Sequence, residues 1–360
     1  MGLKNKARKI RYYILFLIRG FKQKKNYDKA VYIEMLRIVP NRRMLQLSRF
    51  FSENGYICFI HIPVKQFSTM DISGLKLARE KNVIRAKPKD MKKCALVLSD
   101  TVESIPESIK SEKRIYEIDY DVFNKNTDFS DGLFYPISFH PKFLTRKTET
   151  KALAASGNDD RKILALFVGW VDDKYTDEKT HTYFHINTRM EVFSHITEHI
   201  SPQHLYIPES FDDFLSNMDS GNLKNKVILI NSAKFSIPGN RYFDILAQTT
   251  FFIHMCGYVQ PFCHNQIETL AAGVIPISQF SHFFYPHLEN RVNVLAYEKL
   301  SELVSILEKI CGGEYPDIKK MKKNCVQYYK QNLSFDSFIE KINQDVLHKI
   351  YICAGELSII

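Results

Sequence analysis

Apolar and polar positions in the first half of the chain alternate between helical spacing and short continuous apolar runs. NRRMLQLSRFFSENG (41–55) has apolar residues at helical spacing and ends at a glycine-containing turn, which predicts a helix. YICFIHIP (56–63) has the composition of a buried strand, and 93–100 and 113–121 predict two more. Strand, helix and strand in succession predict a parallel α/β sheet for this half of the chain.

The same alternation starts afresh at residue 161. The predicted strands are 161–172, 204–210, 226–234 and 249–257, and the predicted helices are 188–200, 239–248 and 266–272. The tail, 334–352, carries a long helical pattern with one apolar face. Two such sets predict two Rossmann-like, doubly wound domains that face a cleft, where open α/β sheets bind their ligands.

Residues 144–161 are poor in large apolar residues and are interpreted as a linker. The predicted fold is therefore α/β, with a C-terminal helix that crosses back after the second domain. The predicted segments are a basic amphipathic segment (1–25), an N-terminal Rossmann-like domain (26–145), a linker (146–160), a C-terminal Rossmann-like domain (161–330) and a C-terminal crossover helix (331–360).

Positive charge is concentrated at the N-terminus. The first 25 residues hold nine Lys or Arg and no acidic residue, whereas the remainder holds 41 basic and 40 acidic residues. The apolar run 12–18 inside this basic segment predicts contact with an anionic membrane surface, and a disordered, solvated arm is the alternative. Nucleic acid is not a predicted partner, because no second basic stripe with interleaved aromatic residues is present.

Neither a membrane-spanning helix nor a signal peptide is predicted. No apolar run reaches the roughly 18 residues that a membrane-spanning helix needs, and 12–18 lacks a small-residue cleavage site. The seven cysteines are odd in number and form no C-x-x-C pair, which favours buried thiols in a reducing compartment. We therefore predict a cytoplasmic protein on the inner face of the cell membrane.

The stretch CHNQIETLAAGVIPIS (263–278) carries the clearest chemistry. Asn265 and Glu268 have the spacing of a helix-capping pair, and the helix they start would stop at Gly273. The amino end of such a helix favours an anion, so His264 and Asn265 would hold a phosphate. Glu268 would accept hydrogen bonds from a polyol such as ribose, and the alternative is that Glu268 only caps its own helix.

The wider segment 242–278 resembles the nucleotide-sugar-binding segment of GT-B-fold glycosyltransferases, most closely the exostosin-type and fucosyltransferase-like branches. The resemblance implies that Glu268 binds the ribose of a nucleotide sugar, that 161–330 is the donor domain and that 26–145 is the acceptor side. Many retaining members carry a second glutamate where this chain has Gln260, which favours an inverting hexosyl- or fucosyl-type transferase.

Further donor-site candidates lie near predicted strand ends of the second domain. Arg189, Lys234 and Arg241 would contact the diphosphate, and Gly169 would let the backbone approach it closely. For each of these residues the alternative is an ordinary surface charge or a tight turn. No cofactor beyond the nucleotide-sugar donor is implied, and no metal, because no Asp-x-Asp motif precedes a strand end where the diphosphate would need a divalent ion.

An inverting transfer needs a general base that takes the proton of the acceptor hydroxyl. Asp100 and His140 in the first domain are the predicted catalytic candidates, ahead of Asp119. Asp100 follows a predicted strand, and His140 precedes a proline, where it is alternatively a packed turn residue.

The predicted function is the transfer of a sugar from a nucleotide sugar to a lipid-linked or growing surface glycan, of the lipopolysaccharide or capsule type. One alternative is a peripheral membrane adaptor with an inactive sugar-nucleotide fold. Another is a zinc hydrolase that uses His195, Glu198 and His199, because HITEH matches the H-x-x-E-H pattern. A sugar-nucleotide epimerase is disfavoured, since it needs no basic membrane segment.

Overall fold

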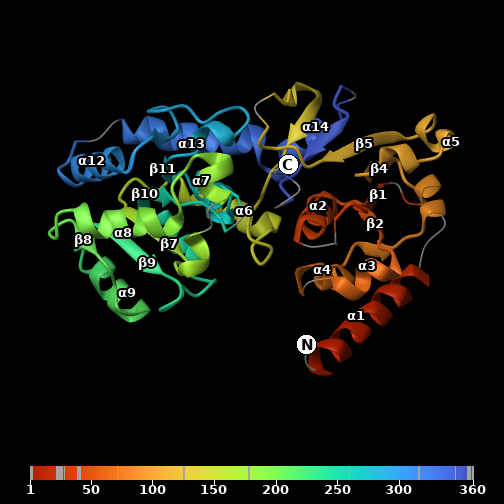
Figure 1. Cartoon of the computed structure of the whole chain (residues 1–360), viewed down its shortest axis with the longest axis horizontal. Coiled ribbons are helices and arrows are strands. Elements are labelled where there is room, and N and C mark those ends of the chain that lie inside the picture. The colour runs from red at the N-terminus through yellow and green to blue at the C-terminus, as the bar shows by residue number, and fades with distance from the viewer. Residues whose placement is uncertain are drawn as a thin grey trace. The chain divides into compact units, whose positions relative to one another are not determined.

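The computed structural model describes residues 3–21, 27, 29–38, 42–70, 72–124, 126–176, 179–258, 260–314, 317–344, 346–354 and 358. The chain divides into two compact units (Figure 1). Unit 1 comprises Met1–Arg146 and Ser334–Ile360, and unit 2 comprises Lys147–Leu333. The C-terminal residues therefore return to the unit in which the chain begins.

Unit 1 is built on a seven-stranded parallel sheet in the order β3-β2-β1-β4-β5-β13-β6. Its strands are β1 (Ala30–Glu34), β2 (Ile57–His61), β3 (Val83–Arg85), β4 (Leu96–Ser99), β5 (Arg114–Asp119), β6 (Gly132–Phe134) and β13 (Lys349–Tyr351). Its α-helices are α1 (Leu3–Phe21), α2 (Arg42–Glu53), α3 (Val64–Thr69), α4 (Ile72–Lys76), α5 (Glu107–Lys110) and α14 (Phe335–Ile342).

Unit 2 is built on a six-stranded parallel sheet in the order β12-β11-β10-β7-β9-β8. Its strands are β7 (Ile163–Gly169), β8 (Leu205–Tyr206), β9 (Val227–Asn231), β10 (Thr249–His254), β11 (Ile275–Ser278) and β12 (Leu295–Ala296). Its α-helices are α6 (Arg146–Ala155), α7 (Lys179–Phe184), α8 (Arg189–His199), α9 (Phe211–Asp219), α10 (Tyr242–Ala247), α11 (His264–Ala271), α12 (Leu300–Cys311) and α13 (Ile318–Asn332).

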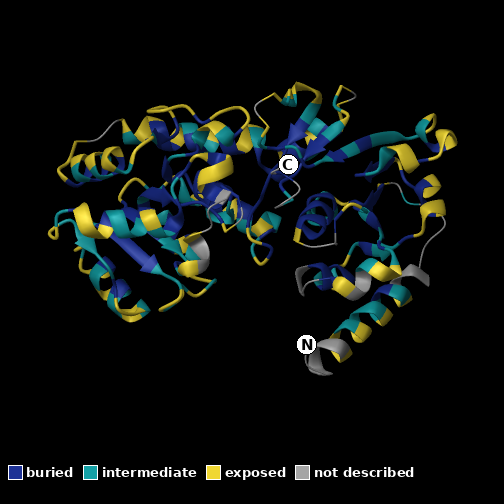
Figure 2. Ribbon diagram, viewed as in Figure 1, coloured by how far each residue is buried: buried dark blue, intermediate teal, exposed yellow. Residues whose placement is uncertain are grey.

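The predicted α/β architecture with two Rossmann-like sheets is confirmed. Figure 2 shows that the central strands of both sheets are buried, which is why they read as apolar runs in the sequence. Strand β1, AVYIE, is buried along its whole length and was not among the predicted strands. The predicted linker contains a helix, α6.

The tail differs from its prediction in one element. The helical pattern predicted over 334–352 ends after α14, and β13 follows as a strand between β5 and β6. The reason is the apolar run 350–353, which is buried in the sheet of unit 1. Helix α14 packs on α2, where Phe50 lies 4.6 Å from Phe335 and 4.9 Å from Phe338 between ring centroids. These contacts explain why the tail returns to unit 1.

Helix α1 packs on unit 1 beside β3 and α4, so the alternative of a disordered arm does not hold for residues 3–21. Phe16 is buried, and the guanidinium of Arg85 lies 5.9 Å from the ring centroid of Tyr13. Ile10, Ile14 and Ile18 are exposed at 61%, 50% and 49%. Within the part of the chain that the structure describes, no helix has both the length and the apolar character needed to cross a membrane.

Candidate functional site

Unit 2 has a strand-order switch point between β7 and β10. The chain leaves β7 toward β8 and β9 on one side of it, and leaves β10 toward β11 and β12 on the other side. The two loops that follow β7 and β10 therefore diverge at the carboxyl edge of the sheet. Crevices of this kind are where open parallel sheets bind ligands.

Arg189, the first residue of α8, joins these two loops. Its Nε and Nη2 donate to the carbonyl oxygen of Cys256 at 3.0 and 2.6 Å, and its Nη1 donates to the carbonyl oxygen of Trp170 at 2.8 Å. The side chain is buried. Because backbone carbonyls accept these hydrogen bonds, Arg189 fixes the shape of both loops, and its contact with a diphosphate stays a prediction.

Gly169 ends β7 in crowded surroundings. A Cβ atom there would lie 2.8 Å from the Phe167 ring and 3.3 Å from Arg189 Nη1. Asn265 of α11 lies at the same place, because its Nδ2 donates to the carbonyl oxygen of Val168 at 3.5 Å. The structure thus brings Gly169, Arg189 and Asn265 together at the switch point, and their contact with a donor stays a prediction.

The predicted capping pair is wrong. The N-cap of α11 is Cys263, which makes no side-chain capping hydrogen bond, and the helix begins at His264. Asn265 instead accepts a hydrogen bond from the Cys263 thiol at 2.6 Å. The extended backbone of Cys263 starts the helix two residues earlier than the spacing of Asn265 and Glu268 suggests. Gly273, with φ of +61°, ends the helix region as predicted.

Glu268 lies one turn into α11 and is only 3% exposed. Burial, followed by the negative charge of Glu268 and the hydrogen bond to it, raises the pKa of Tyr242 well above its usual value. The Tyr242 hydroxyl therefore stays protonated and donates to the Glu268 carboxylate. A carboxylate has about four acceptor positions, so a ribose contact at the positions that Tyr242 leaves open stays a prediction.

The remaining donor-site candidates are placed around this edge. His264 is half-buried in the first turn of α11, next to Asn265. Lys234 is exposed in the loop after β9, and Arg241 is exposed at the N-cap of α10. Both cations follow the carboxyl end of a strand that neighbours β7, so they lie on the edge that carries the switch point.

Unit 1 has its own switch point, between β1 and β4. The chain leaves β1 toward β2 and β3, and leaves β4 toward β5 on the other side. Asp100 follows β4, and its Oδ1 accepts from the Leu36 N–H at 2.6 Å. Its Oδ2 accepts from the Arg37 N–H at 2.9 Å and from the Tyr120 hydroxyl at 2.8 Å. Asp100 therefore binds the loop after β1, and its catalytic role stays a prediction.

Asp100 is buried, and burial raises the pKa of its carboxyl group above the usual value, although the hydrogen bonds from Tyr120 and the backbone oppose the shift. Both oxygen atoms already accept hydrogen bonds. A general base needs a lone pair that reaches the substrate. The structure therefore favours a positioning role for Asp100 over proton transfer.

A second polar cluster at this edge was not predicted. Glu34 ends β1, in register with His61 of β2 and Ser99 of β4. Its Oε2 accepts from the Tyr32 hydroxyl at 2.9 Å and lies 3.1 Å from Nδ1 of His61. Its Oε1 accepts from the Ser99 hydroxyl at 2.9 Å. The sequence signal was a charged or titratable residue at the end of each of two buried runs, AVYIE and ICFIH.

This arrangement orients the imidazole of His61. An ionised carboxylate can only accept hydrogen bonds, so Nδ1 of His61 must carry the hydrogen that it shares with Glu34. The contact with Glu34 uses Nδ1, so Nε2 lies on the other side of the ring. Glu34 is buried, whereas His61 is half-buried. The geometry is that of a histidine oriented by a buried carboxylate.

His140 and Asp119 lie in other surroundings. His140 is exposed, and its Nδ1 accepts from the Lys142 N–H at 3.1 Å. Desolvation by the surrounding protein and several nearby cations lower the pKa of His140, so its ring is neutral and able to accept a proton. Asp119 ends β5 and lies 3.6 Å from Lys349.

The HITEH motif lies on α8. The rings of His195 and His199 stack with centroids 4.0 Å apart, and Nδ1 of His199 lies 3.0 Å from the carbonyl oxygen of His195. Within the described ranges, no group of three or more His, Cys, Asp or Glu is arranged to hold a metal ion. The zinc-hydrolase alternative thus gains no support. None of the seven cysteines forms a disulfide, and six of them are buried, which agrees with the predicted buried thiols.

Comparison with known proteins gives a distant structural likeness. Alr3699/HepE of Anabaena, in complex with UDP, is similar over 87% of this chain and 98% of its own, with 9% identity and a TM-score of 0.44. A glycosyltransferase from Rickettsia africae is similar over 88% and 97%, with 13% identity and a TM-score of 0.44. No family model and no curated protein sequence matches the chain. Because these identities and TM-scores are low, the function is inferred from the residues of this chain.

Proposed function

We propose that the chain is a glycosyltransferase that moves a sugar from a nucleotide-sugar donor to a lipid-linked or growing surface glycan. The observation that carries the proposal is the switch point of unit 2, where Gly169, Arg189 and Asn265 meet at the carboxyl edge of a parallel sheet. The segment 242–278, which resembles the donor-binding segment of GT-B glycosyltransferases, forms one side of this edge.

The donor would lie against the end of β7 and the first turn of α11. The N–H groups and positive dipole end of α11 favour the diphosphate, and the missing side chain of Gly169 allows its close approach. His264 and Asn265 flank this position, and Lys234 and Arg241 add positive charge on the same edge. Glu268 would accept hydrogen bonds from the ribose beside the one that it accepts from Tyr242.

Proton transfer from the acceptor is proposed for unit 1, with His61 as the base. Its Nδ1 is oriented by the buried Glu34 carboxylate, which leaves Nε2 to accept the proton of the attacking hydroxyl. Asp100 is a weaker candidate because three donors occupy its oxygen atoms. His140 stays a second candidate, since it is exposed and its lowered pKa keeps it neutral.

The finer features are proposed from the sequence. Gln260, in place of a second glutamate, supports inverting transfer, and the lack of an Asp-x-Asp motif before a strand end supports transfer without a metal ion. The basic helix α1 supports a location on the cytoplasmic face of the membrane. A membrane adaptor without turnover is the second candidate, and the burial of Glu268 against Tyr242 favours it. A lipopolysaccharide or capsule precursor is the proposed acceptor class.

The test is a thermal-shift screen with uridine, guanosine, cytidine and thymidine diphosphate sugars. Ligand at about 100 times its Kd stabilises the folded protein by about 2.7 kcal/mol, so the bound sugar should raise Tm by several degrees. Glu268→Gln should weaken the affinity for that sugar about 10-fold to 100-fold, because a carboxylate hydrogen bond contributes about 1.5–3 kcal/mol. Tyr242→Phe, the matched control, keeps the carboxylate and should retain the affinity.

The variant His61→Asn tests the proposed base. It should bind the nucleotide sugar as the wild type does and lose hydrolysis or transfer of the sugar, because it removes the base and leaves unit 2 unchanged. A wild type that binds no member of the panel contradicts the proposal. A wild type that binds a nucleotide sugar but neither hydrolyses nor transfers the sugar, with any acceptor, would support the membrane-adaptor alternative.

A further inference from the structure

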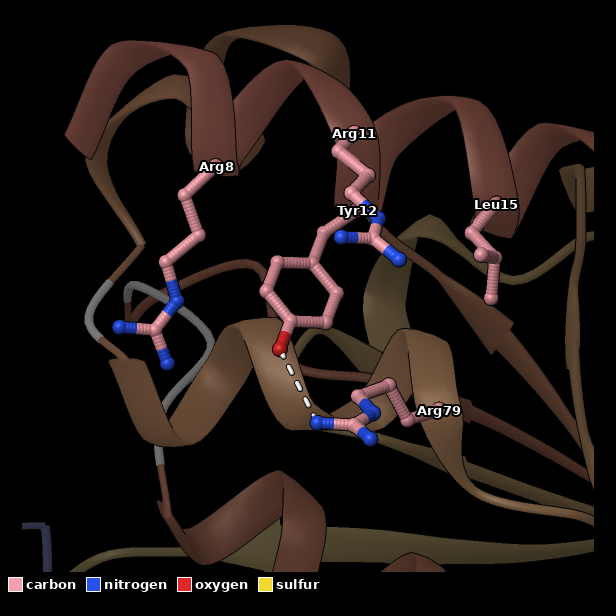
Figure 3. Close-up of a pocket in the computed structure, with 5 residues that line it drawn as sticks. All are labelled: Arg8, Arg11, Tyr12, Leu15 and Arg79. Carbon is pink, nitrogen blue, oxygen red and sulfur yellow. Dashed lines mark hydrogen bonds between the residues drawn. The ribbon is translucent and has the colours of Figure 1, made fainter. Parts of the chain in front are cut away.

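A positively charged pocket lies between α1 and the short 3-10 helix Leu77–Arg79. It has a volume of about 520 Å³ and is lined by Arg8, Arg11, Tyr12, Leu15 and Arg79 (Figure 3). Figure 3 shows the side chains of α1 and that of Arg79 pointing toward a common space around the Tyr12 hydroxyl. Of these five lining residues three are arginines and none is acidic.

Two of the arginines contact Tyr12. Nη1 of Arg79 donates to the Tyr12 hydroxyl oxygen at 3.4 Å, and the guanidinium of Arg8 lies 5.8 Å from the centroid of the Tyr12 ring. The hydrogen bond from Arg79, reinforced by Arg8, lowers the pKa of Tyr12, because the cations stabilise its anionic form. The pocket therefore has a positive potential that favours a bound anion. Arginine forks match the oxygen atoms of phosphate.

An apolar groove adjoins the pocket along the same helix. It has a volume of about 420 Å³ and is lined by Ala7, Ile10, Arg11, Ile14, Leu15 and Ile18. Arg11 and Leu15 line both the pocket and the groove, so the two share a wall. The three isoleucines follow one another at intervals of one helical turn and are exposed.

We propose that the arginine pocket binds the headgroup phosphate of an anionic phospholipid while the isoleucine ridge enters the outer part of the same bilayer leaflet. The ligand is a lipid because a soluble phosphate would fill the cationic pocket and leave three large apolar side chains in water. A helix with cationic and apolar faces lies in the plane of a membrane surface in this way. The proposal rests on the membrane part of the proposed function and not on sugar transfer.

The experiment is sedimentation of the full chain with vesicles of phosphatidylcholine alone and with 30% phosphatidylglycerol, at roughly 0.1 M salt. The wild type should bind the mixed vesicles. Arg8→Gln/Arg11→Gln/Arg79→Gln should bind them about 100-fold more weakly, since each of the three basic residues near an anionic surface contributes about 5-fold. Ile10→Ser/Ile14→Ser/Ile18→Ser should also bind more weakly, because it removes the apolar part of the contact.

The matched control is Lys319→Gln/Lys320→Gln/Lys323→Gln on α13, which removes the same charge from three exposed residues. Its affinity for the mixed vesicles should fall by less than about 3-fold, because these lysines line neither the pocket nor the groove. All variants change exposed residues, so their circular dichroism and Tm should match those of the wild type. Their thermal shift with nucleotide sugars should also be unchanged, which separates this proposal from sugar transfer.

Three results would overturn the proposal. Equal losses in the arginine and lysine variants would show a diffuse attraction of charge without a pocket. Saturation of the pocket by millimolar glycerol phosphate without lipid, seen as a thermal shift that the arginine variant lacks, would make the ligand a soluble phosphate. Wild-type binding that is the same with and without phosphatidylglycerol would also contradict it.

Discussion

At the residue scale, two buried side chains of opposite charge have the same role, which is to fix loops by hydrogen bonds to backbone groups. Arg189 in unit 2 donates to carbonyl oxygens of the loops after β7 and β10, and Asp100 in unit 1 accepts from N–H groups of the loop after β1. Each lies at a strand-order switch point, where two loops part. A buried charge that is fully hydrogen-bonded fixes loop shape, and its removal leaves several backbone groups unpaired.

The buried ring of His254, at the end of β10, makes the stability of the folded protein depend on pH. Its ring is fully buried, its Nε2 lies 2.9 Å from the Thr269 hydroxyl, and its Nδ1 has no hydrogen-bond partner among the residues that the structure describes. Burial lowers the pKa of His254 to about 3. Below about pH 6.5 the unfolded chain therefore binds a proton at His254 that the folded chain does not bind. Stability falls as the pH falls.

We expect the burial of His254 to lower the unfolding free energy by about 2 kcal/mol when the pH falls from 7 to 5. His254→Gln should reduce that acid sensitivity, whereas His199→Gln, at an exposed histidine of the same unit, should retain it. Urea unfolding followed by the fluorescence of Trp170, the single tryptophan of the chain, measures the effect in unit 2. An unchanged slope of stability against pH in His254→Gln would contradict the assignment.

At the element scale, α11 and the strand after it position the candidate donor site. Gly273 ends this helix region with φ of +61°, and β11 begins two residues later. A Cβ atom on Gly273 would lie 2.9 Å from Cβ of Ser156 and 3.1 Å from Cγ2 of Val326. This position therefore requires glycine for both its backbone conformation and its space, and Ser156, just after α6, and helix α13 pack against it there.

Gly273→Ala should lower the unfolding free energy of unit 2 by about 2–4 kcal/mol, from the left-handed backbone and the crowding together. Gly221→Ala is the matched control, because Gly221 has φ of +80° and open space around it. Gly221→Ala should lower the unfolding free energy by only about 1 kcal/mol. Urea unfolding read by Trp170 fluorescence compares the two. Equal losses would mean that the packing of α11 on its neighbours is looser than the structure shows.

The elements also show what the sequence could and could not predict. Long periodic helices and apolar strands such as 41–55, 56–63 and 226–234 were predicted close to their observed bounds. The tail strand was missed, because 350–353 continues a helical pattern and only pairing with β5 and β6 makes it a strand. The cap of α11 was misplaced, since Cys263 adopts the extended backbone that the Asn265 spacing had suggested for Asn265.

At the scale of the whole molecule, the two units divide the proposed function between them. Unit 2 carries the candidate donor residues, and unit 1 carries the Glu34–His61 cluster and helix α1, which is proposed to bind lipid. Sequence reasoning could group the candidate residues of α11 because they are contiguous in 263–278. It missed Glu34 and His61 because only the register of β1 against β2 brings them together.

The central claim is that a nucleotide sugar binds at the switch point of unit 2. Hydrogen exchange of the wild type, with and without the panel member that gives the largest thermal shift, tests this most directly. Amides just after β7 (169–172), those after β10 (255–258) and the first turn of α11 should become protected, while the amides of unit 1 next to β1 and β4 change less. Protection confined to unit 1, or none in these three segments at saturating ligand, would contradict the account.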